Sequence, residues 1–419
     1  MSRRRFLRAT LASMSGSLLA ACTLAVPELP EPRPTVAPAS VTGEVTLGLI
    51  LSLTGRYSRE GALMLAGYQT WQRAVEEAGG IKLGDGRRAL RIELQDDASE
   101  PLNAGRHAER LAGQGGIGLL LGPFSSGITT AVAMVTSRLG AVLVAPDASA
   151  AGLYRRALSG LFSILPTDDH LLHGLADLAA SVQPRAQPVG IIIADEPTNA
   201  AAADGFRERA AALGLQPVRL ELTALGSADI TPPLERLAAD SPRFVILATE
   251  AGQTRRYAPS LREYLPNTAM RALIPLPGPV DLAGRRARLY DGVLTVENWS
   301  DVIKANGPVL GSASEFAQRF VRQHGYAPDV RSAAAAAAGL ALQLGIEQAA
   351  SADPVAVQAA LSSLDVTTFW GPLAWDLAGR NRLAVPPVLQ QQGDQLVAIY
   401  PQQLAGGQLR YPLAGWPRD

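Results

Sequence analysis

Short apolar runs alternate with amphipathic stretches along most of this chain, starting at residue 45. The run 45–51 (VTLGLIL) predicts a buried strand, and apolar residues in 60–78 recur at the spacing of one helix face. The alternation continues with strands at 90–94, 117–121 and 141–144 and helices at 103–111 and 128–139. Repeated strand–helix units of this length predict a parallel sheet with helices on both faces.

A second series of the same kind begins near residue 170. Its elements are expected at 170–182, 189–193, 202–213, 217–222, 233–239 and 244–248. Further helices are expected at 314–323 and 333–350, and strand-like pieces at 373–375 and 396–400. Since 419 residues exceed the roughly 100–200 of one domain, the two series predict an α/β protein with two doubly wound parallel-sheet lobes.

The composition is that of a globular protein, with 47% hydrophobic and 18% charged residues. Basic and acidic residues number 38 each, but four arginines (Arg3, Arg4, Arg5 and Arg8) stand in an N-terminal leader without acids. Without these four, 34 basic residues face 38 acidic ones. This mildly acidic balance argues against nucleic acid as a partner, because phosphate binding relies on clustered basic charge.

Residues 2–8 (SRRRFLR) match the pattern of twin-arginine export signals. The weakly apolar stretch that follows, 9–21, is shorter than the ~20 strongly apolar residues of a membrane-spanning helix. It ends in Leu-Ala-Ala before Cys22, which resembles the lipobox of bacterial lipoproteins. We therefore expect a lipoprotein signal peptide at 1–21 and lipidation of Cys22; the alternative is that Cys22 is an ordinary small apolar residue.

Cys22 is the only cysteine of the sequence, so an internal disulfide is excluded. A proline-rich tether is expected at 22–42, because the run PELPEPRPTVAP favours an extended polyproline II conformation. The folded body should then begin near residue 43. We expect an exported protein, in the periplasm or at the cell surface, that is anchored to a membrane by its lipid.

No motif in the sequence supports an enzyme, a cofactor or a metal site. The run 113–118 (GQGGIG) matches the dinucleotide fingerprint, but it follows a helix and leads into a strand, the reverse of the required context. His170 and His173 share a helix face, yet no further cysteine is available to complete a soft metal site. The acidic pairs 96–97 and 168–169 are interpreted as strand and helix-cap residues.

Two loops with small polar residues follow successive strands of the first series. GPFSSG at 122–127 precedes the helix at 128, and APDAS at 145–149 follows the next strand. Helix N-termini bind anions, and open α/β sheets bind ligands at the carboxyl ends of their strands. The loops therefore predict a ligand site; the alternative is that their serines only cap helices.

Short motifs also occur in a distinctive order along the chain. They are LTG at 53–55 with Gly61 and Gly67, EAGGI at 77–81, Asp96-Asp97, GPFSS at 122–126, the segment 316–328, FWGPL at 369–373, Asp376, Gly379-Arg380, VLQ at 388–390 and IYP at 399–401. In this order and spacing, the sequence resembles the branched-chain amino-acid-binding (leucine/isoleucine/valine-type) family of ABC-transporter substrate-binding proteins. The resemblance extends from about residue 45 to residue 401.

The resemblance implies a type I periplasmic binding fold, in which three crossovers join two lobes that hold a ligand between them. Lobe 1 is then expected at 43–164 and 296–365, and lobe 2 at 165–295 and 366–419. The implied function is not catalytic: the protein would capture an amino acid or similar small polar solute for the permease of an ABC importer.

The resemblance also implies which residues contact the ligand. Ser126, the backbone carbonyl of Ala148, and Ser149 are expected to hold the carboxylate and ammonium of an amino acid, with Ser125 beside them. Glu250 is added as an expected ligand-binding residue of lobe 2.

Lobe 2 departs from the family pattern at three places. Thr198-Asn199 stands where the family often has Tyr-Gly, and Glu250 stands where aromatic residues often follow a strand. The proline-rich run 274–279 lies near the place where an acid usually meets the ligand's ammonium. These departures leave a second function open, in which a lipoprotein of the same fold is an interaction partner that activates a cell-wall synthase or sensor.

Overall fold

A computed structural model describes residues 41–276 and 289–413 of the chain. The expected signal peptide at 1–21, Cys22 and the tether up to residue 40 lie outside these residues, as do 277–279 of the proline-rich run. Among the helices that the structure describes, none is both long and apolar enough to cross a membrane.

The first series of elements builds a six-stranded sheet with the order β2-β3-β1-β4-β5-β6. Its strands are β1 (Val41–Leu51), β2 (Ile81–Leu83), β3 (Gly86–Asp96), β4 (Leu119–Leu121), β5 (Val142–Ala145) and β6 (Leu161–Ser163). Neighbouring strands are parallel except β2, which forms an antiparallel hairpin with β3. We call this sheet, together with the helices that cover it, the first lobe.

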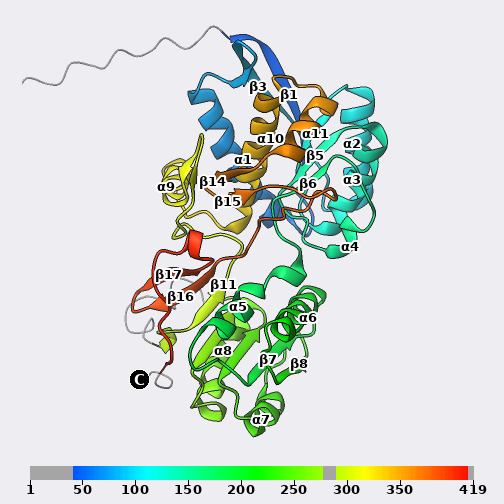
Figure 1. The fold of residues 1–419 in the computed structure, drawn as a ribbon. Coiled ribbons are helices and arrows are strands. Elements are labelled where there is room, and N and C mark those ends of the chain that lie inside the picture. The colour runs from blue at the N-terminus through cyan, green and yellow to red at the C-terminus, as the bar shows by residue number, and fades with distance from the viewer. Residues whose placement is uncertain (1–40, 277–288, 414–419) are drawn as a thin grey trace, which may run out of the picture. The chain divides into compact units, whose positions relative to one another are not determined.

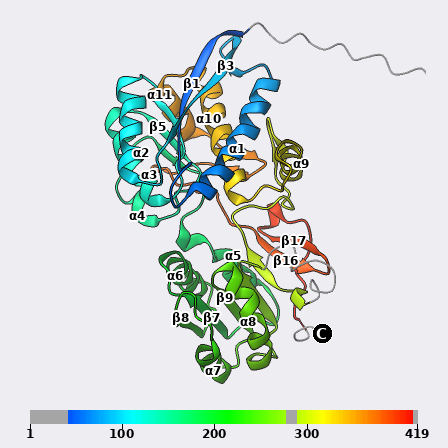
Figure 2. The same ribbon diagram turned by 180° about the vertical axis from the view of Figure 1, so that it is seen from behind.

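Helices cover both faces of this sheet (Figures 1 and 2). They are α1 (Ser58–Glu77), α9 (Ala313–His324), α10 (Val330–Ala349) and α11 (Pro354–Ser363) on one face, and α2 (Pro101–Ala108), α3 (Ser126–Leu139) and α4 (Ala151–Tyr154) on the other. Leu47 and Leu49 of β1 pack on the first face and Ile50 on the second. From Leu47 to Leu51, β1 is apolar because both of its faces are buried there.

α1 and α10 pack closely although they are far apart in the sequence. The indole Nε1 of Trp71 donates a hydrogen bond to Oε1 of Gln343 at 2.9 Å, across 272 residues of chain. A Cβ added to Gly67 would lie 2.0 Å from the carbonyl oxygen of Ser332, so only glycine permits this approach. The contact fixes the first turn of α10, where Arg331 stands.

The second series builds a seven-stranded sheet with the order β17-β16-β11-β10-β9-β7-β8. Its strands are β7 (Val189–Ala194), β8 (Val218–Thr223), β9 (Phe244–Ala248), β10 (Met270–Ile274) and β11 (Leu294–Val296), all parallel, and the antiparallel pair β16 (Val388–Gln392) and β17 (Gln395–Tyr400). Helices α5 (His173–Ser181) and α6 (Pro197–Ala212) cover one face, and α7 (Thr231–Ala239) and α8 (Ala251–Tyr264) cover the other. This second lobe confirms the prediction of two doubly wound α/β lobes.

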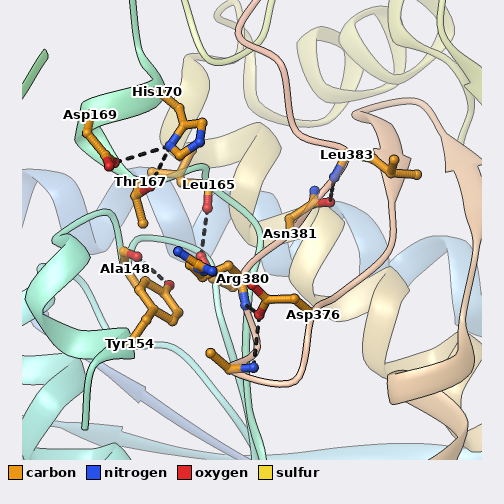
Figure 3. Close-up of polar contacts among 12 residues, drawn as sticks. Ala148, Tyr154, Leu165, Thr167, Asp169, His170, Asp376, Arg380, Asn381 and Leu383 are labelled. Atoms are coloured by element: carbon orange, nitrogen blue, oxygen red, sulfur yellow. Dashed lines mark hydrogen bonds and ion pairs between the residues drawn. The ribbon is translucent and has the colours of Figure 1, made fainter. Parts of the chain in front are cut away.

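The chain passes three times between the two sheets: after β6, after β11 and before β16. The first and third connections are hydrogen-bonded to each other. The N–H of Ser163 donates to the carbonyl of Gly379 at 2.9 Å, and Nε1 of Trp375 donates to the carbonyl of Ser163 at 2.7 Å. Figure 3 shows Asp376 and Arg380 of the third connection beside the first.

The expected start of the last lobe 2 segment, at residue 366, differs from the packing. β14 (Val366–Thr368) and β15 (Gly371–Leu373) form a hairpin whose Phe369 stacks on Phe316 of α9, with ring centroids 4.2 Å apart. Residues 366–375 therefore pack with the first lobe, and the chain rejoins the second sheet only at β16. Burial of aromatic rings decides this placement, and strand patterning does not reveal it.

Candidate functional site

A cavity of about 360 Å³ lies where loops of both lobes meet. It is lined by Met64, Phe124, Pro146, Asp147, Ser149, Leu165, Pro166, Thr167, Asp168, Leu171, Glu196, Thr198, Asn298, Val330, Arg331 and Ala334. Its size lies within the range of about 300–1,000 Å³ that is typical of small-molecule sites. Apolar and charged side chains both line it, so it suits a solute that carries both kinds of group.

The strands of both sheets explain why the cavity forms here. Asp147 follows β5, Glu196 follows β7 and Asn298 follows β11, so all three stand at carboxyl ends of strands. In the first sheet β1 lies between β3 and β4, and the strand order therefore reverses at β1. Open α/β sheets bind ligands at such a reversal, as the sequence led us to expect.

Of the expected ligand-binding residues, Ser149 is the one that lines the cavity. Its carbonyl accepts a hydrogen bond from the N–H of Asp168 at 2.9 Å, and its hydroxyl is hydrogen-bonded to the carboxylate of Asp168. Ser149 thus ties the loop after β5 to the first connection between the lobes. Both segments therefore line the cavity.

Ser125 and Ser126 hold the neighbouring loops in place. Ser125 is the N-cap of α3, and its hydroxyl accepts a hydrogen bond from the N–H of Ile128 at 3.4 Å. The hydroxyl of Ser126 accepts one from the N–H of Ala150 at 3.0 Å, which links the loop after β4 to the loop after β5. Neither serine lines the cavity.

Ala148 and Glu250 also lie outside the cavity lining. The carbonyl of Ala148 accepts a hydrogen bond from the hydroxyl of Tyr154 at 2.5 Å, and both residues are buried (Figure 3). Glu250 is the exposed N-cap of α8, after β9. The lining therefore includes one of the five expected residues, and the ligand-binding role of all five stays a prediction.

Sequence reasoning missed Arg331, the one basic side chain among the described residues that line the cavity. Asp329, the N-cap of α10, accepts hydrogen bonds from the N–H groups of Arg331 and Ser332 at 3.0 Å. The carboxylate of Asp329 also lies 3.4 Å from Nη1 of Arg331, and the guanidinium lies 5.7 Å from the centre of the Phe124 ring. A lone arginine in the first turn of an alanine-rich helix was the available signal.

Two carboxyl groups near Arg331 have raised pKa values. Burial raises the pKa of Asp147 to about 6, against the opposing effect of Arg331, and Asp168 raises it further. Burial likewise raises the pKa of Glu297, which follows β11, to about 7, again opposed by Arg331. Arg331 thus interacts electrostatically with one acid that follows a strand of the first sheet and with one that follows a strand of the second.

Acids outnumber bases in the cavity. The ionisable side chains of its described lining are Asp147, Asp168 and Glu196 against Arg331. Burial raises the pKa of Asp168; the hydrogen bond from Ser149 lowers it, and the charges of Asp169 and Glu196 raise it. The second lobe contributes Glu196 and Thr198 to the lining. Thr198 is one of the residues at which the sequence departs from the family pattern, so this departure lies at the cavity.

The other motifs of the sequence have structural roles. The glycine-rich run 113–118 joins the π-helical segment Glu109–Gln114 to β4, as a helix-to-strand turn. The rings of His170 and His173 lie 4.6 Å apart, but no cluster of metal-ligating side chains occurs in residues 41–276 and 289–413. Asp96 accepts hydrogen bonds from the loop after β1.

Residues 44–394 match a family model described as periplasmic binding protein. The chain belongs to the periplasmic binding protein family. Both sheets overlap the matched range, and every cavity-lining residue named above lies within it. Membership confirms the family resemblance noted in the sequence.

Several known proteins are similar to this chain. A Leu/Ile/Val-binding protein, BraC3, from Rhizobium johnstonii is 34% identical over 126 residues, which are 30% of this chain and 33% of that protein. A putative branched-chain amino acid ABC transporter structure from Silicibacter pomeroyi has a TM-score of 0.72 at 18% identity, over 88% of this chain and 99% of that chain. A solute-binding protein from R. palustris in complex with benzoate has a TM-score of 0.60 at 19% identity, over 86% and 99%.

The solved structures share the fold of this chain. The segment that matches the Rhizobium relative spans about a third of that protein's length. The relatives are binding proteins rather than enzymes, which agrees with the prediction of a non-catalytic chain.

Proposed function

We propose that this protein captures a small carboxylate-bearing solute, an amino acid in particular, for the permease of an ABC importer. The observation that carries the proposal is the cavity between strand ends of the two lobes, which Arg331 and Asp147 both line and in which they interact electrostatically. A guanidinium beside a carboxylate matches the two charged ends of an amino acid.

The binding mode follows from the charges. The ligand's carboxylate would pair with Arg331, and its ammonium would pair with Asp147, whose carboxylate accepts no hydrogen bond from the described residues. Phe124 and Leu171 supply apolar surface for the rest of the ligand. The known relatives support this class of ligand: one is named for leucine, isoleucine and valine, and another holds benzoate, which is also a carboxylate.

Delivery requires that the protein be exported and held near its permease. The twin-arginine leader and the Cys22 motif support a lipid-anchored protein at the membrane surface. Membrane association of the Cys22→Ala chain, compared with the unaltered chain after cell fractionation, tests the anchor. Equal association of the two chains contradicts it.

A thermal-shift screen across amino acids, amides and small carboxylates tests the binding function. A ligand at 100 times its Kd stabilises the folded chain by about 2.7 kcal/mol, which gives a measurable shift. We expect at least one amino acid to raise the melting temperature. If no solute does, the same fold acts instead as an interaction partner, and the proposal is overturned.

A further inference from the structure

We infer that the cavity selects a solute with a second cationic group, namely a basic amino acid, and that Asp168 and Glu196 receive that group. The inference rests on the proposed function and specifies its substrate class. It follows from how the four ionisable side chains of the cavity lining are placed and partnered.

The first step is the charge balance. With all four groups ionised, Asp147, Asp168 and Glu196 carry three negative charges, and Arg331 carries one positive charge. A zwitterionic ligand such as leucine adds no net charge. Closure around it would therefore shield an uncompensated excess of two negative charges from water, which is unfavourable.

The second step separates the acids into two groups. Asp147 interacts electrostatically with Arg331, so this pair offers one site for a carboxylate and one for an ammonium. Asp168 and Glu196 instead repel each other, and Glu196 adds to the rise of the pKa of Asp168. Both residues line the same cavity, so a cation bound between their carboxylates would relieve this repulsion.

The third step concerns the partners already present. Ser149 gives the carboxylate of Asp168 one hydrogen bond, and the carboxylate of Glu196 accepts none from the described residues. Both side chains therefore keep free lone pairs for a ligand. Asp168 lies on the first connection between the lobes and Glu196 on the second lobe, so one cation between them joins the two parts.

The fourth step is the shape of the required ligand. Leu165 and Leu171 line the cavity together with these charged groups and favour methylene groups. A basic amino acid has a carboxylate and an ammonium at one end, a methylene chain, and a cation at the other. This order of groups matches the lining.

Calorimetric titration with two matched ligand pairs tests the inference. Citrulline has the shape of arginine without its charge. Norleucine is lysine without its ε-ammonium group. We expect the charged member of at least one pair to bind about 10-fold or more tightly than its neutral partner. Equal or tighter binding of norleucine and citrulline overturns the inference and leaves the proposed function intact, whereas no binding of any amino acid overturns both.

A variant locates the selectivity. Glu196→Gln should reduce the preference for the charged over the neutral ligand about 10-fold. Glu208→Gln is the matched control, because Glu208 is exposed on the same helix, α6, away from the cavity. An unchanged preference in Glu196→Gln contradicts the assignment of the second cation to this carboxylate.

Discussion

Arg331 lines the cavity, and its only signal in the sequence is its place in the first turn of an alanine-rich helix. It stands 184 residues after Asp147 in the sequence, yet both residues line one cavity. The serines of the loops after β4 and β5 stand out in the sequence, and most of them hold those loops in place. Residue type identified two loops that line the cavity, but only one of the five residues expected to bind the ligand lies in that lining.

Ser126 and Ser149 are expected to respond differently to removal of their hydroxyls. Ser126→Ala breaks the bond to Ala150 and should cost about 1 kcal/mol of stability with little effect on affinity. Ser149→Ala should weaken ligand binding roughly fivefold, because its hydroxyl orients Asp168 at the cavity. Calorimetric melting and titration of both variants measure the two effects, and equal losses of affinity would contradict this division.

The raised pKa of Asp147 predicts a pH dependence of stability. Since the pKa rises from its ordinary 3.8 to about 6, the folded chain holds this proton more tightly than the unfolded chain. Without ligand, stability should therefore fall as the pH rises from about 4 to about 6. Asp147→Asn removes this ionisation and should flatten that part of the curve in urea denaturation. Parallel curves for both proteins would show that Asp147 ionises normally.

At the scale of elements, long periodic segments were predictable and short buried ones were not. β1, α1 and α10 agree with the apolar pattern to within a few residues. The helix α8 was missed because its sequence contains Pro259 and many polar residues. The strand β10 was missed because all five of its residues are buried, so no alternation of buried and exposed positions marks it as a strand. Nothing in the local sequence shows that the 366–373 hairpin packs against α9.

The candidate site was predictable only as a location. The rule that ligands bind at carboxyl ends of strands led to the loops after β4 and β5, and Phe124, Asp147 and Ser149 of these loops line the cavity. Glu196 and Arg331 come from other elements, whose approach depends on tertiary packing. A single sequence without structure does not contain that information in any local pattern.

The contact between α1 and α10 gives a prediction at this scale. Gly67→Ala would bring a Cβ to 2.0 Å from the Ser332 carbonyl, so the helices must separate, at a cost of about 2–4 kcal/mol. Affinity should fall as well, since Arg331 is the neighbour of Ser332. Gly105→Ala on α2, whose nearest contact would be 3.8 Å, is the control. Chemical denaturation measures the stability of both variants. Similar stabilities of Gly67→Ala and Gly105→Ala would contradict the proposed packing.

For the whole molecule, the proposed ligand would bridge the two lobes, because residues of both line the cavity. Its lining comes from both sheets and from the first connection between them, so a ligand gains its full set of contacts only when the lobes approach. A ligand favours the conformation with which it makes more contacts. Binding and closure are therefore expected to be coupled.

Small-angle scattering should detect this closure. The radius of gyration is expected to decrease when the strongest ligand of the thermal-shift screen is added, because hinge closure brings the lobes together. A solute that does not shift the melting temperature serves as the control. Tight binding with no change in the radius of gyration would contradict closure.

Calorimetric titration of Arg331→Gln with the same ligand tests the central claim most directly, namely that the cavity binds the carboxylate of a small solute. Loss of a hydrogen bond to a charged group costs about 1.5–3 kcal/mol, so Kd should rise about 10- to 150-fold. Arg322→Gln, an exposed residue of α9 outside the cavity, should leave Kd unchanged. A wild-type Kd for Arg331→Gln would show that the ligand binds elsewhere.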